Sequence, residues 1–292
     1  MPTTESRTAI RAMLYMTLGV FGFCVLDALT KRLTEDYGTW QIIFLSRVVT
    51  TTAILLLVTR SHRSIRPLQS RFVKTHLMRS VLVIATTWTF FECLRYIDLA
   101  DAVAIAFAAP LFMTALSGPL LGEKVGWRRW SAVSIGFIGV IIAVQPSAEG
   151  IGYGAFLALC AAATYALLQL WLRPLSGREV SHNIIFYSTL FSGLLAMFPA
   201  IAEWRWPDTT GWIIVLAQGS CSTIAQTCMI RAFRQGEASM LAPLEYTGLI
   251  WAGLFGYLFW DEIPTLQVII GACIIIAAAI YIAQREAKKK AG

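Results

Sequence analysis

The sequence predicts an all-α membrane protein of ten transmembrane helices, arranged as two inverted five-helix repeats. Three observations predict this fold class. Ten apolar stretches fill almost all of the 292 residues, and most approach the ~20 residues that a helix needs to cross ~30 Å of hydrocarbon. Hydrophobic residues make up 57% of the chain and charged residues only 14%, against roughly 25% charged in a soluble domain. The two halves also resemble each other in sequence.

The apolar stretches give the positions of the expected helices. We expect spans at residues 12–30, 40–59, 77–95, 102–121, 130–145, 153–172, 184–202, 212–230, 239–260 and 265–283. These are continuous apolar runs, not the ~10-residue alternating segments of an outer-membrane barrel, so helices are expected and strands are not. The first span leads directly into the second, and no small-residue cleavage site follows it, so we expect no removable export signal.

Lys and Arg residues are distributed unevenly between the expected loops. If the N-terminus is cytoplasmic, the opposite side holds only Lys31, Arg32, Arg95 and Arg205, and Arg47 lies within a span. The cytoplasmic side then holds the other nineteen of the 24 basic residues: Arg7, Arg11, Arg60, Arg63, Arg66, Arg71, Lys74, Arg79, Lys124, Arg128, Arg129, Arg173, Arg178, Arg231, Arg234, Arg285, Lys288, Lys289 and Lys290. The positive-inside rule therefore places both termini in the cytoplasm. This orientation, together with contact to anionic lipid, accounts for the net charge of +7 without nucleic-acid binding.

Two short patterns recur in the second half of the chain. Residues 41–47 (QIIFLSR) and 183–189 (NIIFYST) are identical at four of seven positions. A second match pairs Thr87 with Thr223 and Arg95 with Arg231, 136 residues apart. Five helices in each copy bring the second copy into the membrane from the opposite side, which is the inverted plan of many secondary transporters.

Several motifs occur at corresponding places in this layout. They are residues 27–31 (DALTK), the arginine in span 2, Gly122-Glu123 after span 4, residues 242–246 (APLEY) and residues 260–264 (WDEIP). With these motifs the chain resembles, over essentially its whole length, the EamA branch of the drug/metabolite transporter superfamily. The resemblance implies EamA-like repeats at residues 1–148 and 149–292. It also implies a central cavity lined mainly by spans 1, 3, 4, 6, 8 and 9, and transport of a small organic molecule in either direction.

Three charged residues are expected in one layer of the bundle, near the non-cytoplasmic side: Asp27, Arg47 and Glu92. A charge at the bilayer centre costs about 2.5–3.5 kcal/mol on insertion scales, so such residues normally face a cavity or a partner. They could form structural ion pairs, Asp27 with Lys31 and Glu92 with Arg95. Alternatively, Arg47 or Lys31 binds a substrate carboxylate or phosphate, while Asp27 or Glu92 receives an amine or a proton.

Glu245 lies two residues after Pro243 in span 9. A proline frees a backbone carbonyl and can bend the helix toward a cavity. Glu245 is therefore the first candidate for proton coupling or cation contact, and Glu92 is the second; the alternative for Glu245 is a structural acid with local hydrogen bonds. Pro110 in span 4 is the matching kink, and the two prolines are expected to mark the helices that bend during gating.

Four aromatic residues, Trp88, Tyr165, Tyr246 and Trp251, lie within spans, where they could stack against a substrate or simply pack. The sequence thus favours an inner-membrane secondary transporter of a small polar or zwitterionic metabolite, amino-acid-like or cofactor-like. It would act by alternating access, with proton coupling as a hypothesis. A passive channel and, less so, a membrane-embedded enzyme are the alternatives. No phosphate loop, metal-ligand spacing or nucleophile–base constellation is present in the sequence, so we expect no enzyme, metal or cofactor. The expected partners are a small-molecule substrate and the bilayer, with the protein a monomer or homodimer.

Overall fold

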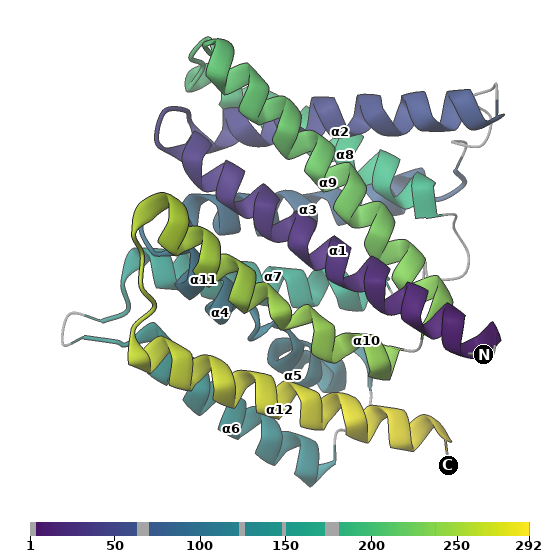
Figure 1. The fold of residues 1–292 in the computed structure, drawn as a ribbon, viewed down its shortest axis with the longest axis vertical. Helices are drawn as coiled ribbons and strands as arrows, with labels where there is room; N and C mark the ends of the chain where they lie inside the picture. Colours follow the sequence, from purple (N-terminus) through teal and green to yellow (C-terminus); the bar gives the residue numbers. More distant parts are fainter. Residues whose placement is uncertain are drawn as a thin grey trace.

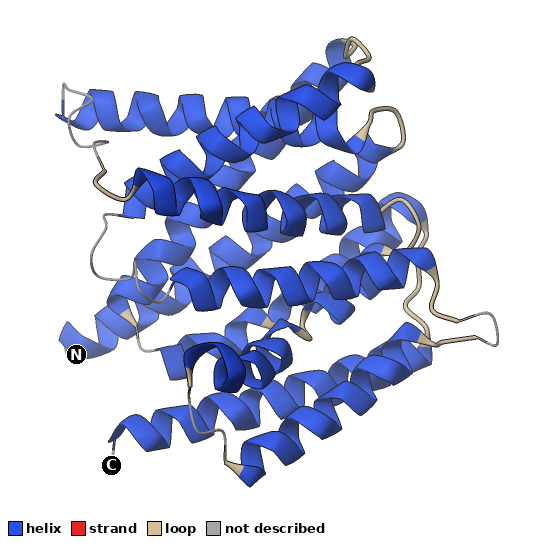
Figure 2. Cartoon of the chain, turned by 180° about the vertical axis from the view of Figure 1, so that it is seen from behind, coloured by secondary structure: helices blue, strands red, loops and turns tan. Residues whose placement is uncertain are grey.

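The computed structural model describes residues 4–62, 70–122, 126–147, 150–172, 181–236 and 238–291, which form twelve helices (Figure 1). The helices are α1 (Thr4–Thr34), α2 (Thr39–His62), α3 (Val73–Cys93), α4 (Leu99–Ala106), α5 (Ala109–Leu121), α6 (Trp127–Val144), α7 (Tyr153–Leu172), α8 (Ser181–Ala202), α9 (Thr209–Gln235), α10 (Ala238–Glu245), α11 (Thr247–Trp260) and α12 (Leu266–Ala291). They occupy all ten segments expected to be helical, and no strand forms among the described residues (Figure 2). Outside the described residues lie Glu123 and five of the basic residues counted above: Arg63, Arg66, Lys124, Arg173 and Arg178.

Two of the expected spans are each divided into two helices. α4 and α5 are separated by two turn residues just before Pro110, and α10 and α11 are separated at Tyr246, three residues after Pro243. A proline has no N–H and so removes one bond of the helical ladder. The two breaks meet, because the ring of Phe107 contacts the ring of Tyr246 edge to face, with 5.1 Å between the centroids. The broken helices therefore touch at their interruptions.

The helices lie side by side along a common direction, with both termini at one end of the bundle (Figure 1). We call this end the terminal end. The other end, which we call the distal end, includes the α1–α2 loop (35–38), the α8–α9 loop (203–208) and the α11–α12 loop (261–265). α1 packs against α9, α2 against α8, α3 against α7 and α8, and α6 against α12. Each of these pairs joins the first half of the chain to the second.

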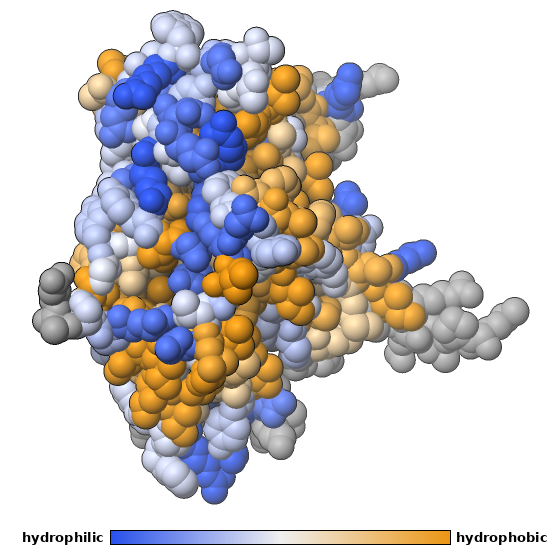
Figure 3. Space-filling view, turned by 60° about the vertical axis from the view of Figure 1, so that its left-hand side comes forward, coloured by the Kyte–Doolittle hydropathy of each residue, from blue (hydrophilic) through white to orange (hydrophobic). Residues whose placement is uncertain are grey.

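Eight segments of the described chain form helices long and apolar enough to cross a membrane, judged by length and composition. The outward faces of the bundle carry large apolar side chains, including Leu57, Phe198, Ile213 and Ile250, each more than half exposed. Hydrophilic residues gather at the distal end, and hydrophobic residues cover much of the flank beside it (Figure 3). So much exposed apolar surface suits lipid rather than water, and the protein is a multi-pass membrane protein.

Small residues line the crossing of α6 and α12. A Cβ atom built at Gly271 of α12 would lie 2.6 Å from the carbonyl oxygen of Gly139 in α6 and 2.7 Å from the Cβ of Ala143. A Cβ at Gly139 would likewise lie 2.9 Å from the carbonyl oxygen of Gly271. Backbone therefore packs on backbone at this crossing, as small residues permit between membrane helices.

Gly271→Ala should destabilise the protein by about 1–3 kcal/mol, because the added methyl group overpacks a contact made by backbone atoms. Gly253→Ala in α11 is the matched control. A Cβ there meets only Pro264 Cγ at 3.9 Å, so the replacement should be neutral or stabilise the helix by up to about 1 kcal/mol. Thermal unfolding in detergent micelles measures both. Equal effects at the two glycines would contradict the packing argument.

Candidate functional site

Asp27 lies on the interior face of α1. It shares that face with Cys24, Lys31 and Thr34, all of which are buried. The residue is partly exposed, and its carboxylate has neither a hydrogen bond nor an ion pair among the described residues. The expected pairing of Asp27 with Lys31 does not form, because the Lys31 ammonium is held elsewhere, by Glu262. Asp27 is an acid within a membrane helix that lacks a protein partner in the described chain.

Arg47 lies on the interior face of α2, between the fully buried Ile43 and Thr50. Its Nη2 donates to Thr87 Oγ1 of α3 at 2.7 Å. Its Nε is buried and has no hydrogen-bond partner in the described part of the chain. A neutral hydroxyl therefore orients the guanidinium, and its remaining N–H groups are available to donate to an anion.

Lys31 is held in a closed cluster at the distal end. Its ammonium pairs with the Glu262 carboxylate, donates to the Ile97 carbonyl at 3.1 Å and lies 5.5 Å from the centroid of the Trp260 ring. The second carboxylate oxygen of Glu262 accepts from the backbone N–H of Leu99 at 2.9 Å, at the first turn of α4. The side chains of Lys31 and Glu262 are only 9% and 12% exposed. This lysine thus joins α1 to the loops before α4 and after α11.

The position of Glu262 follows from the way α11 ends. Asp261 adopts a left-handed conformation with φ of 55°, which Asp tolerates better than most residues. The chain then reverses, and the Glu262 N–H donates to the Gly256 carbonyl at 3.1 Å. Pro264 follows two residues later, which is common after such a helix end. Residues 260–264 (WDEIP) are therefore a helix terminator that turns one carboxylate back toward Lys31.

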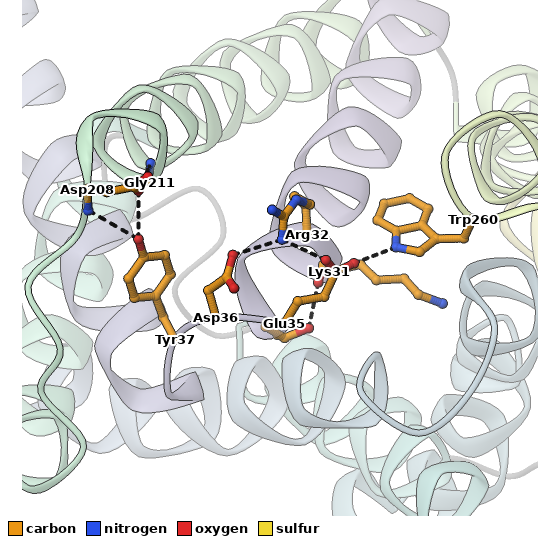
Figure 4. A network of polar contacts seen from close by, with 9 residues as sticks. Lys31, Arg32, Glu35, Asp36, Tyr37, Asp208, Gly211 and Trp260 are labelled. Atoms are coloured by element: carbon orange, nitrogen blue, oxygen red, sulfur yellow. Dashed lines mark hydrogen bonds and ion pairs between the residues drawn. The ribbon is translucent and has the colours of Figure 1, made fainter.

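Further polar contacts bind the end of α1 to both neighbouring loops (Figure 4). Arg32 donates to Glu35 at 2.6 Å, and the Trp260 indole donates to the same carboxylate at 2.7 Å. On the other side, the Tyr37 hydroxyl donates to Asp208 at 3.0 Å, ahead of α9. The first half of the chain is thereby tied at the distal end to two loops of the second half.

Two pockets flank the end of α1 at the distal end. A pocket of about 400 Å³ is lined by Lys31, Thr34, Glu35, Leu94, Arg95, Tyr96, Ile97, Asp98, Trp260 and Glu262. A second, of about 360 Å³, is lined by Glu35, Asp36, Tyr37, Gly38, Arg95, Ala202, Glu203, Trp204 and Arg205. Both linings are rich in charge, and neither includes Asp27 or Arg47. The closed cluster around Lys31 forms part of the wall of the larger pocket.

The expected pair of Glu92 and Arg95 is confirmed. Arg95 Nε lies 3.4 Å from Glu92 Oε2, and the Thr39 hydroxyl donates to the same carboxylate. Tyr96 also donates to Glu92, at 3.4 Å. Glu92 is thus well partnered, in contrast to Asp27.

The stability of the protein should depend on pH through Asp98. Burial raises the pKa of this carboxyl most, the nearby Glu262 carboxylate raises it further, and the Lys31 ammonium lowers it. A raised pKa means that the charged carboxyl is disfavoured in the folded protein. The loss of stability therefore grows as the pH rises from the unfolded-state pKa of about 3.9 through the higher folded-state pKa. Asp98→Asn should raise the melting temperature at pH 7, and the gain should vanish below about pH 4. Thermal unfolding in micelles across this pH range tests it. Asp36→Asn, which removes an exposed acid paired with Arg32 at 2.9 Å, should give no gain.

Three of the four aromatic candidates are held in ring contacts. Trp88 stacks on Trp40 with 5.5 Å between the centroids and 21° between the planes. Trp251 meets Phe21 edge to face at 5.0 Å, and its indole N–H is buried without an acceptor in the described chain. Tyr246 contacts Phe107 at the helix breaks, as described above. Glu245 precedes Tyr246 directly, is partly exposed, and has no hydrogen bond or ion pair among the described residues.

Arg79 was counted with the basic residues of the cytoplasmic side, near the start of the span expected at residues 77–95, and was not among the candidate site residues. α3 begins at Val73, four residues before the predicted span, so Arg79 lies in the second turn of a helix. It is buried and donates to the Ser188 hydroxyl of α8, while its Nε has no partner in the described chain. Val73 and Leu77 are apolar residues at helical spacing ahead of it, and this signal could have extended the span.

Lipid-facing helices around unpaired interior charges are typical of a polytopic membrane transport protein. The chain belongs to the EamA-like transporter family, whose family model matches residues 10–145 and again residues 152–284. The family therefore places it among transporters and not among enzymes.

Curated relatives match between 73% and 97% of the chain. An S-adenosylmethionine uptake transporter of Rickettsia prowazekii (strain Madrid E) is 23% identical over 97% of this chain and 95% of its own length. A pseudopaline exporter, CntI, of Pseudomonas aeruginosa (strain UCBPP-PA14) is 27% identical over 94% and 96%. A riboflavin transporter of Vibrio cholerae serotype O1 (strain ATCC 39315 / El Tor Inaba N16961) is 29% identical over 73% and 72%. A crystal structure of a protein with 18% sequence identity superposes with a TM-score of 0.66, covering 96% of this chain and 99% of that one, and so shares the fold.

Proposed function

We propose that this protein is an inner-membrane secondary transporter that moves a small zwitterionic metabolite by alternating access. Asp27 and Arg47 are the basis of this proposal. They have opposite charges, lie on interior faces of their helices and have no charged partner in the described chain. Asp27 lies seven residues before the end of α1 and Arg47 eight residues after the start of α2. At about 1.5 Å per residue, both are about 10–12 Å from the distal ends of their helices. Since isolated charges are costly in a membrane, a substrate with a carboxylate and an amine would satisfy both.

The relatives support a small organic metabolite as the substrate, because the three are named for such molecules. They include an uptake transporter and an exporter, so flux is to be measured in both directions.

Two inverted repeats, residues 1–148 and 149–292, are part of the proposal. The helix contacts support them, since the main contacts between the halves have counterparts when the halves are exchanged. α1 with α9 corresponds to α7 with α3, and α2 with α9 to α8 with α3, while the α2–α8 and α6–α12 contacts correspond to themselves. Gly122 and Asp261, matched in the repeat, both end a helix in the left-handed conformation, with φ of 69° and 55°. The double match of the family model lends further support.

The proposed orientation has both termini in the cytoplasm. The terminal end carries the basic residues Arg11, Arg60, Lys74 and Arg128 near helix ends, which is the charge bias of a cytoplasmic side. The proposed bending points are the breaks beside Pro110 and Pro243. Contact between Phe107 and Tyr246 would couple the two bends.

Counterflow in proteoliposomes tests the transport function. A library of zwitterionic metabolites that includes S-adenosylmethionine, with uncharged riboflavin added for comparison, is first screened for thermal stabilisation of the purified protein. A carrier should then accumulate labelled hit compound against an excess of the unlabelled compound inside. Ohmic current without saturation or counterflow would identify a channel and refute alternating access.

Proton coupling is proposed to reside in Glu245, the unpartnered acid beside the α10–α11 break. Glu245→Gln should abolish accumulation driven by a pH gradient while exchange of substrate for substrate continues, because exchange needs no net proton movement. Glu92→Gln is the matched variant, and it should have a smaller effect since Glu92 is already paired with Arg95. Unchanged pH-driven uptake in Glu245→Gln would exclude the role.

A further inference from the structure

A second interior arginine lies closer to the terminal end than Arg47. Arg79 of α3 is only 8% exposed, and no carboxylate pairs with it among the described residues. Its single hydrogen bond in that part of the chain goes to the neutral hydroxyl of Ser188. Its Nε is buried and unpartnered. A buried guanidinium without an anion destabilises the folded protein, and binding of an anion would offset this free-energy cost.

Residues from three other helices lie at the depth of Arg79. Arg79 is six residues from the terminal-end start of α3, and Ser188 and Glu245 are each seven residues from the starts of α8 and α10. Tyr165 is seven residues before the end of α7. At about 1.5 Å per residue, all four lie about 9–11 Å from the terminal-end limits of their helices.

Tyr165 marks open space at this depth. It shares the interior face of α7 with Ala158, Ala161 and Ala162, which are 0%, 3% and 1% exposed. Tyr165 itself is 44% exposed. Because its neighbours on that face are buried, the exposed area of Tyr165 opens toward the interior of the bundle and not toward lipid.

Tyr165 lies near both charges at this depth. Its phenol is within electrostatic range of both Glu245 and Arg79. One cation, one acid and a phenol therefore surround interior space, in the same combination of charges as Asp27 with Arg47. The net charge of this group suits a zwitterion better than a doubly charged phosphate, which Glu245 would repel.

We propose that Arg79 is a second anion-binding residue of the pathway, which holds the carboxylate of the zwitterionic substrate near the terminal end. The inference rests on the transport function proposed above and extends it to a second position along the path. Thr87, the partner of Arg47, and Arg79 are eight residues apart on α3, or about 12 Å. A substrate carboxylate would pass from Arg47 to Arg79 along this helix.

The test measures the electrostatic potential at position 165 and needs no substrate. The six native cysteines are replaced, and Tyr165→Cys provides one thiol. Its reaction rates are measured with the anionic reagent sulfonatoethyl methanethiosulfonate and the cationic reagent trimethylammonium-ethyl methanethiosulfonate, the sulfonate being the probe anion. Arg79→Gln should lower the anionic-to-cationic rate ratio by at least about fivefold, which corresponds to about 1 kcal/mol.

Two controls separate anion binding from helix packing. Arg79→Lys keeps the charge, and Ser188→Ala removes only the hydrogen bond; both should leave the ratio within about twofold. If Arg79→Gln does not fold, Glu245→Gln replaces it and should raise the ratio at least about threefold, because Arg79 then acts unopposed. Failure of both reagents to reach the introduced thiol, or a ratio that ignores Arg79→Gln and Glu245→Gln, overturns the proposal. The thiol reaction rates do not depend on transport. They can therefore be interpreted even if the counterflow experiment is negative.

Discussion

Replacing Arg47 with Gln should reduce substrate transport by a factor on the order of 100 while the protein still folds. The proposed role of Arg47 is a charge-assisted contact to the substrate carboxylate, and losing one partner of such a buried contact costs about 2–5 kcal/mol, with every 1.4 kcal/mol a factor of ten. Neutral Gln also removes a desolvated charge, so the fold should not suffer. Initial rates of uptake into proteoliposomes measure the effect.

Thr87→Val is the control for Arg47. It deletes the hydroxyl that accepts from Arg47 Nη2 at 2.7 Å but keeps the cation, so it should lower transport by less than about tenfold, in line with the loss of about 1 kcal/mol for one hydrogen bond. If Arg47→Gln transports at the normal rate, or if Thr87→Val is equally impaired, Arg47 is a structural residue rather than a ligand of the substrate.

The second large effect is expected at the buried pair of Lys31 and Glu262. Glu262→Gln should destabilise the protein by about 3–5 kcal/mol, because it leaves the Lys31 ammonium buried without its carboxylate. Gln still offers an oxygen to the Leu99 N–H, so the start of α4 keeps its acceptor. Equilibrium unfolding in mixed micelles gives the free energy.

A double-mutant cycle identifies the origin of that loss. Lys31→Met with Glu262→Gln removes the buried charge and should recover more than half of the lost stability. Simple addition of the two single effects would mean that the pair does not act as a unit.

The sequence predicted the positions of the helices well, because continuous apolar runs and proline positions are local properties. It also predicted the pairing of Glu92 with Arg95, since residues at i and i+3 are neighbours on any helix. It failed for Lys31, which was expected to pair with Asp27 one turn away. The actual partner, Glu262, is 231 residues distant, and only the tertiary fold brings it near.

The interior site was predictable in part. A charge inside an apolar run is visible without a structure, which is why Asp27, Arg47 and Glu245 were identified as candidates. Arg79 was missed because it lies near the start of a span, where a basic residue is usually a loop residue under the positive-inside rule. Its burial depends on Ser188 of α8, a contact between halves that no local pattern encodes.

The crossing of Gly139 with Gly271 has a mechanical consequence. Where backbone touches backbone, no side-chain rotamers can change to accommodate a shift. We therefore expect α6 and α12 not to slide past one another in small steps, as helices that pack through long side chains do. We therefore expect α6 and α12 to move together as one rigid unit at the edge of the bundle. In the proposed alternating access, we therefore expect the movement that opens the two sides in turn to occur in the helices that carry the charges.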